Sequence, residues 1–199
     1  MHRVLVVLLG ATTLAFGQEA VVVKSTIWID IVKRGDMIRS VRGVGALAAN
    51  STVELRIAET QANDIKPGQR AQFDTRNGLV EGKVVRVLPG VSDGLVKVEA
   101  EVAGALPSGA VPGLNVDGVI DVDVLKDVMY VGRPVMASPQ SEGVLFKLEP
   151  DGQHATKVTV HYGQAGVNTI AVRSGLQPGD KVILSDMTVF AAKDRIRLQ

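Results

Sequence analysis

The 199-residue sequence contains no cysteine, which excludes disulfide frameworks, thiolate zinc sites and cysteine nucleophiles. Aromatic residues are scarce, with four Phe, two Tyr and one Trp. Neither sign of charge is in excess, because 22 Lys and Arg face 21 Asp and Glu. A neutral, aromatic-poor chain lacks the basic footprint and stacking platforms that nucleic-acid binding needs, and it offers little for sugar binding. The composition therefore predicts no nucleic-acid partner.

Long apolar runs are also lacking, except at the very start of the chain. There, Arg3 precedes an apolar run of roughly 13 residues, which is shorter than the ~20 that a spanning helix needs. Small residues at Ala15 and Gly17 fit cleavage before Gln18. We therefore expect residues 1–17 to be a secretory signal peptide, with an uncleaved membrane anchor as the alternative.

What the sequence has in abundance is strict alternation of apolar and polar residues, the pattern of strands with one buried face. It is clearest in TIWIDIV (26–32), TVELRI (52–57), LVKVEAEV (95–102) and VIDVDV (119–124). The residues expected to face inward are Ile27, Ile29, Ile31, Val53, Leu55, Ile57, Val96, Val98, Ala100, Val102, Ile120, Val122 and Val124. The many valines support strands, since β-branched side chains fit a pleated surface.

Turn residues separate these segments, at KPGQ (66–69), RNG (76–78), SDG (92–94), EPDG (149–152) and QPGD (177–180). In KPGQ and QPGD, proline and glycine suit the two central positions of a type II turn. Only ETQANDI (59–65) favours a short helix. Many short strands joined by turns indicate a β-barrel or sandwich. We predict an all-β protein with at most one short helix.

The stretch DTRNGLVEGKVVRV (74–87) resembles three different motifs in part. A phosphate-binding loop needs four residues between its glycines and a Ser or Thr after the lysine, whereas Gly78 and Gly82 enclose three and Val84 follows Lys83. An aspartic protease needs two aspartates brought together, and no second copy of the motif occurs. Asn-Gly between apolar runs instead predicts a hairpin with a type I′ turn.

Other polar residues do not form a catalytic or metal-binding pattern. Asp117, Asp121 and Asp123 lack the order of a calcium loop and are expected on a solvated strand face. Beyond the first residues the histidines are His154 and His161, while a catalytic zinc usually needs three protein ligands. No Gly-x-Ser-x-Gly elbow occurs. We therefore predict no enzyme, with no catalytic residue, cofactor or metal.

The last residues, KDRIRLQ (193–199), are locally basic. Alternation predicts a final edge strand, with Ile196 and Leu198 inward and Arg195 and Arg197 outward. Anionic lipid headgroups would attract such charges by about 1 kcal/mol per residue, so two or three of them give only weak attachment.

Several stretches in a particular order resemble the periplasmic adaptor family, the membrane fusion proteins of the HlyD type that serve efflux and secretion pumps. Within that family the likeness is to adaptors of macrolide-export ABC transporters. The stretches are STIWIDIVKRGDMIRSVRGVGAL (25–47), ELRIAETQANDIKPGQRAQFDTRNGLVEGKVVRVLPG (54–90), VDVLKDVMYVGRPV (122–135) and GVNTIAVRSGLQPGDKVILSDM (166–187).

The resemblance implies a β-barrel domain at 54–124 and a membrane-proximal β-domain at 125–199. Strands within 18–53 would join the membrane-proximal domain and lead into a shortened junction. The family places a lipoyl domain and a long α-helical hairpin at this junction, whereas here AANS (48–51) leads directly into the next strand. A junction of four residues suits a hairpin between adjacent strands.

The function implied is a non-catalytic, membrane-peripheral adaptor in the periplasm that docks on an inner-membrane transporter of the ABC type. Full-length adaptors, or further copies of this chain in a ring, are the other expected partners. The alternative is a stand-alone exported β-barrel protein that binds a small ligand, although small barrels normally fill their interior. Because loops on rigid scaffolds commonly carry contacts, the expected interface residues are Arg76, Asn77 and Arg133.

Overall fold

The computed structural model describes residues 19–199, so the predicted signal peptide at 1–17 lies outside the described part of the chain. Strands dominate this part. In order, the elements are β1 (Ala20–Val22), the 3₁₀ turn η1 (Lys24–Thr26), β2 (Ile29–Ile31), β3 (Lys33–Leu47), β4 (Thr52–Ala58), α1 (Glu59–Ala62), β5 (Arg70–Asp74), β6 (Leu79–Ser92), β7 (Leu95–Val102), β8 (Asn115–Gly132), β9 (Glu142–Leu148), β10 (His154–Ala165), β11 (Thr169–Ser174), β12 (Lys181–Ile183), the 3₁₀ turn η2 (Thr188–Phe190) and β13 (Arg195–Leu198).

The predicted fold class is confirmed, since residues 19–199 are mostly β and contain one α-helix, α1, which has a single turn where ETQANDI favours it. Among residues 19–199, no helix reaches the length and apolarity needed to cross a membrane.

Six strands close on themselves to form what we call the barrel lobe. The pairings run β3–β4–β7–β6–β5–β8 and return to β3, and every one of them is antiparallel. Residues 48–51 connect β3 to β4 as a hairpin, as expected for so short a junction. Closure leaves each of these strands with two partners and so protects their backbone groups from pairing with other chains.

The interior of the barrel lobe is filled by apolar side chains. Val53, Leu55, Ile57 and Val98 are completely buried, as their alternation with polar residues predicts. Gly118 faces Leu55 so closely that a Cβ at position 118 would lie 2.6 Å from its Cδ1 atom. Glycine is needed here for space, because real Cβ atoms do not approach other heavy atoms this closely.

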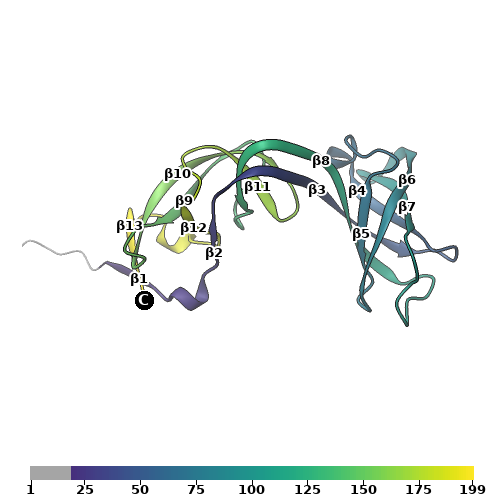
Figure 1. Cartoon of the computed structure of the whole chain (residues 1–199), viewed down its shortest axis with the longest axis horizontal. Helices are drawn as coiled ribbons and strands as arrows, with labels where there is room; N and C mark the ends of the chain where they lie inside the picture. Colours follow the sequence, from purple (N-terminus) through teal and green to yellow (C-terminus); the bar gives the residue numbers. More distant parts are fainter. Residues whose placement is uncertain (1–18) are drawn as a thin grey trace, which may run out of the picture.

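Strands β3 and β8 extend beyond the barrel lobe as one long antiparallel ladder, from the Ala46–Asn115 pair to the Lys33–Tyr130 pair. Figure 1 shows these two strands arching from the barrel lobe to the rest of the molecule, which gives the chain an elongated, bent shape. The predicted domain boundary near residue 125 therefore falls inside a continuous strand rather than in a linker. The division into two domains stays a prediction.

The other end of the arch is what we call the second lobe. Its sheet runs β2–β12–β9–β10–β11–β8, and β13 pairs with both β10 and β1. Two apolar clusters stabilise it. The larger cluster includes Val32, Val131, Val160, Ile170 and Val182, and the smaller includes Val22, Phe146, Ile183, Ile196 and Leu198.

Three details differ from the sequence-based expectations. Ile31 is 44% exposed and the buried residue of that segment is Val32, because β2 is only three residues long and the chain turns into β3. Val124 is 42% exposed because β8 has left the barrel lobe at that point. Strand β13 is not an edge strand, since β1 and β10 cover both its sides, although Ile196 and Leu198 do point inward.

Candidate functional site

Arg76 and Asn77 lie in the hairpin between β5 and β6 in the barrel lobe. The hairpin is present as predicted, but its turn is not type I′, because Arg76 has a φ of 63° while Asn77 has no positive φ. The pair of positive φ values required by a type I′ turn occurs instead at Asp93 and Gly94, between β6 and β7. The Asn77 side chain lies beside Gly109, so it contributes to the packing of a neighbouring loop.

Arg133 lies in the second lobe, immediately after β8, and the structure does not bring it together with Arg76 and Asn77 (Figure 1). Its guanidinium donates from Nε to the carbonyl of Ala137 at 3.3 Å and from Nη1 to the carbonyl of Gly166 at 3.1 Å. Arg133 therefore ties two loops of the second lobe together and lines the cavities between them.

Beside Arg133, a set of large apolar side chains is exposed to solvent, and we call it the Trp28 surface. Trp28, the only tryptophan, is 78% exposed, and Val135 and Met136 are 72% and 71% exposed. Its further member is Val144, which is 55% exposed. Large apolar side chains gathered in this way on a soluble protein typically mark a site of protein or membrane contact.

Two concavities join these residues into one surface. A cavity of about 720 Å³ is lined by Trp28, Val135 and Leu184, and a groove of about 180 Å³ is lined by Met136, Val144 and Leu184. Pro134 and Ser185 also line both, so the cavity and the groove are adjacent. Concave apolar sites of this kind suit the side chains of a partner, because the anchors of protein interfaces fill such pockets.

The backbone under Trp28 is held on both sides. The Trp28 N–H donates to Oγ of Ser185 at 2.8 Å, and the Trp28 carbonyl accepts from the N–H of Leu184 at 2.7 Å. The backbone of Trp28 is thus held in place beneath an exposed side chain. A rigid aromatic residue loses little conformational entropy on binding, which favours its use as an anchor.

Asp30 and Gly132 form the wall of the larger cavity. Oδ2 of Asp30 accepts the N–H of Gly132 at 2.7 Å and so attaches β2 to the end of β8. A Cβ on Gly132 would lie 2.7 Å from Cδ1 of Leu184 and 2.9 Å from Oδ2 of Asp30, so a larger residue here would displace one of these side chains. Asp30 and Arg133 are the charged residues that line the cavity, one of each sign.

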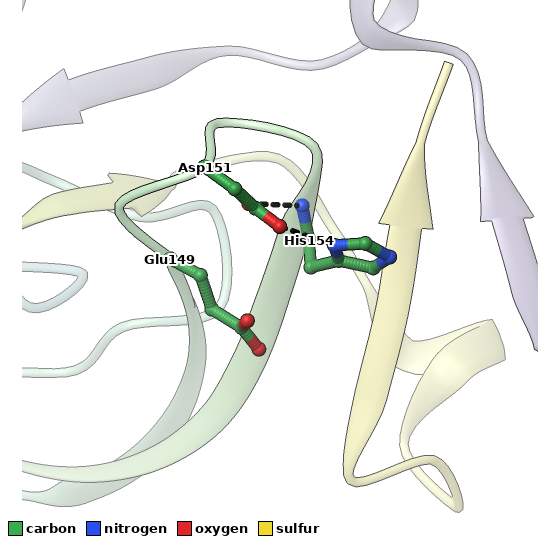
Figure 2. A group of neighbouring side chains, drawn as sticks. All are labelled: Glu149, Asp151 and His154. Atoms are coloured by element: carbon green, nitrogen blue, oxygen red, sulfur yellow. Dashed lines mark hydrogen bonds and ion pairs between the residues drawn. The ribbon is translucent and has the colours of Figure 1, made fainter.

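A separate site, made of polar residues, lies in the turn between β9 and β10, where Glu149, Asp151 and His154 come together (Figure 2). One potential ligand atom from each lies within 4.8 Å of the others, which is the separation expected of metal ligands. Sequence analysis did not associate these residues, although the turn EPDG places both carboxylates within five residues of the histidine.

The hydrogen bonds of this cluster indicate a structural role rather than metal binding. Both oxygens of Glu149 accept from Arg195, at 2.7 Å from Nε and 2.8 Å from Nη2. Oδ1 of Asp151 accepts two backbone N–H groups, and its Oδ2 lies 2.5 Å from Nδ1 of His154. Since the Arg195 guanidinium supplies the positive charge, the cluster acts as an ionic clasp that joins β13 to the β9–β10 turn.

The same bonds hold both carboxylates in their charged form. The hydrogen bonds from Arg195 lower the pKa of Glu149 to about 2, and the hydrogen bond with His154 lowers the pKa of Asp151 to about 2. His161, on the same strand as His154, is exposed and lies 3.4 Å from Glu142, apart from the clasp.

The three aspartates of β8 lie along the strand as expected of residues on its solvated side. Asp117 and Asp123 are exposed and Asp121 is half-buried. Asp117 lies opposite Asp74 of β5, and Asp123 lies opposite Arg39 of β3. The aspartates therefore have different neighbours and do not form one cluster.

No family model and no curated protein sequence matches this chain. Among solved structures, the crystal structure of ZneB from Cupriavidus metallidurans is similar with a TM-score of 0.34 and 18% sequence identity. The match covers 69% of this chain and 41% of that protein, so the chain spans well under half the length of ZneB. This likeness is distant and concerns the fold alone.

Proposed function

We propose that this protein is a non-catalytic periplasmic adaptor subunit that docks on an inner-membrane export transporter, and that the Trp28 surface makes the contact. The observation that carries the proposal is the exposure of Trp28, Val135 and Met136 around a cavity of about 720 Å³ and the adjacent groove. The resemblance of four ordered stretches of the sequence to the adaptor family supports the choice of partner.

The Trp28 surface fits an apolar partner better than a soluble small molecule. Trp, Met and other large side chains are enriched at interface centres, and charged residues are depleted there. Asp30 and Arg133 are the charged lining residues of the cavity, and charges at an interface direct orientation more than they add affinity. We therefore expect an apolar element of the transporter to enter the cavity, with polar groups facing Asp30 and Arg133.

Within this proposal Arg133 belongs to the contact surface. Arg76 and Asn77 belong to the other lobe, and their role at an interface stays a prediction. The alternative of a ligand-binding barrel has less support, because the interior of the barrel lobe is occupied by side chains such as Phe73, Leu55 and Ile120, all completely buried.

Capture of the tagged chain from membranes of a host that expresses ABC exporters tests the proposal. The double variant Trp28→Ala/Met136→Ser removes the anchors without touching a buried side chain. Leu79→Ala is the matched control, since Leu79 is 65% exposed on the barrel lobe. We expect a transporter to be recovered with the parent chain and the control and lost with the double variant. Equal recovery with all three chains would exclude the Trp28 surface, and recovery of no transporter would contradict the adaptor function.

A further inference from the structure

A separate cavity of about 490 Å³ lies where the two lobes meet. Four segments form it: residues 39–42 of β3, Thr60 and Gln61 of α1, the connection between β8 and β9, and residues 164–167 at the end of β10 and in the loop that follows. Its volume falls within the range of roughly 300–1,000 Å³ that is usual for small-molecule sites. The cavity adjoins the larger cavity of the Trp28 surface, because Arg133 and Val167 line both, but its other lining residues are different.

The charge of this cavity is of one sign. Arg39, Arg42 and Arg133 line it, and no Asp or Glu is among its lining residues. The remaining polar groups come mainly from Gln61, Gln140 and Gln164, whose amides can donate hydrogen bonds. Positive charges that converge on a concave surface lined by no acidic side chain favour an anionic ligand.

Arg39 is the most enclosed of the three arginines, since its side chain is only 14% exposed. Its Nη2 donates to Oδ2 of Asp64 at 2.6 Å, so the carboxylate of Asp64 balances the charge of this arginine. Its Nε, however, is buried and has no acceptor within residues 19–199. A buried donor without a partner is rare in folded proteins and is often found where a ligand or ion belongs.

No carboxylate in the described part of the chain balances the charge of the other two arginines. Arg42 is exposed and forms no ion pair in the described part of the chain. Arg133 bonds only to the carbonyls of Ala137 and Gly166, which hold its guanidinium in place but do not cancel its charge. Nε and Nη1 are engaged in these bonds, while Nη2 makes no hydrogen bond within residues 19–199 and is held in place to donate to a carboxylate or phosphate.

The local backbone also indicates a built site rather than an accidental gap. Opposite Arg39 and Ser40, β8 carries the extra residue Val122, so the ladder bulges at the cavity. Such bulges commonly redirect side chains next to functional sites. The β10–β11 loop lies directly on this point of β3, because a Cβ on Gly166 would lie 3.1 Å from the Ser40 nitrogen.

We propose that the cavity between the lobes binds a small anion that presents a carboxylate or phosphate group to Arg42 and Arg133. Soluble metabolites and anionic lipid headgroups share this chemistry. The proposal does not depend on the adaptor function. Arg133 lines both cavities, but Arg39 and Arg42 line this one alone.

Isothermal titration with citrate and with inorganic phosphate tests the proposal on the isolated chain. The test variant is Arg42→Gln, which changes an exposed side chain and leaves the core intact. The matched control is Arg197→Gln, an exposed strand arginine on β13 without an ion pair among residues 19–199. We expect at least one probe to bind, and we expect Arg42→Gln to weaken it by about tenfold or more while the control has no effect.

Co-sedimentation with phosphatidylcholine vesicles, with and without phosphatidylglycerol, distinguishes a lipid source of the anion from a soluble one. Binding to the anionic vesicles that Arg42→Gln abolishes would support the site with a headgroup as ligand. Binding of any probe that is equal in Arg42→Gln and the control would overturn the proposal. So would the absence of binding to citrate, phosphate and anionic vesicles.

Discussion

Arg195 and Glu149 form an ion pair with two parallel hydrogen bonds, 2.7 and 2.8 Å long, between the last strand and the turn that begins β10. The pair connects residues 46 positions apart in the chain and continues through Arg195 to Glu19 at 3.3 Å. Strand β13, next to the C-terminus, is therefore held by side chains as well as by its backbone bonds to β1 and β10.

This ion pair predicts how the second lobe responds to acid. The pKa of Glu149 is about 2 when folded, below the ~4.3 of an unfolded glutamate, so its contribution to stability is present above about pH 4. The contribution is lost as the pH falls from about 4 to about 2. We expect Glu149→Gln to lower the melting temperature at pH 7 and to have no effect near pH 2.

Glu59→Gln, at an exposed glutamate without an ion pair in the described residues, is the control and should have no effect at either pH. A loss of stability in Glu149→Gln that persists at pH 2 would contradict the ion pair as its cause.

The core of the barrel lobe predicts a large effect of truncation. Leu55 is completely buried and lies against Gly118. We expect Leu55→Ala to lower the free energy of unfolding by about 2–5 kcal/mol, measured by urea titration. Val44→Ala, on the neighbouring strand and 52% exposed, should change it by less than about 0.5 kcal/mol. Similar losses in the two variants would show that the interior of the barrel lobe is not packed as described.

Two hairpin turns have similar sequences, Asp93-Gly94 between β6 and β7 and Asn77-Gly78 between β5 and β6. Their backbone geometries predict different effects of alanine. Gly94 has a φ of 73°, where a Cβ costs about 1–2 kcal/mol. Asn77 has no positive φ. We expect Gly94→Ala to lower the free energy of unfolding by about that amount and Asn77→Ala to change it by less than about 0.5 kcal/mol. The reverse order would indicate that Asn77, and not Gly94, occupies a left-handed position.

The exposure of Trp28 can be checked without a partner, because it is the only tryptophan. At 78% exposure its indole should be quenched by acrylamide almost as strongly in the native protein as in urea. Its emission maximum should move little on unfolding. Binding of the proposed transporter should shift the emission to shorter wavelength and protect it from quenching, since anchors of this kind are desolvated. A native protein whose tryptophan is strongly shielded would exclude the Trp28 surface as an open docking site.

Much of the local structure could be predicted from sequence because it depends on near neighbours. Alternation identified the inward faces of β4 and β7, where Leu55 and Val98 are completely buried. Proline followed by glycine identified two type II turns, and Gly68 and Gly179 have the positive φ values of 88° and 94° that such turns require. Alternation failed at Ile31 and Val124, because it shows which residues share a face and not whether another layer covers that face.

The sequence by itself determined that this chain is β-rich, that its strands have one apolar face, and where most of its turns lie, since all of these follow from side-chain periodicity and backbone preference over a few residues. Only the tertiary structure decided that β5 closes the ring on β8 and that β3 and β8 form one arch. It also decided that Trp28 is exposed beside Met136, and that Arg39, Arg42 and Arg133 share a cavity. These relationships join residues as much as about 100 positions apart, and the pairing of distant strands that creates them leaves no local signal in the sequence.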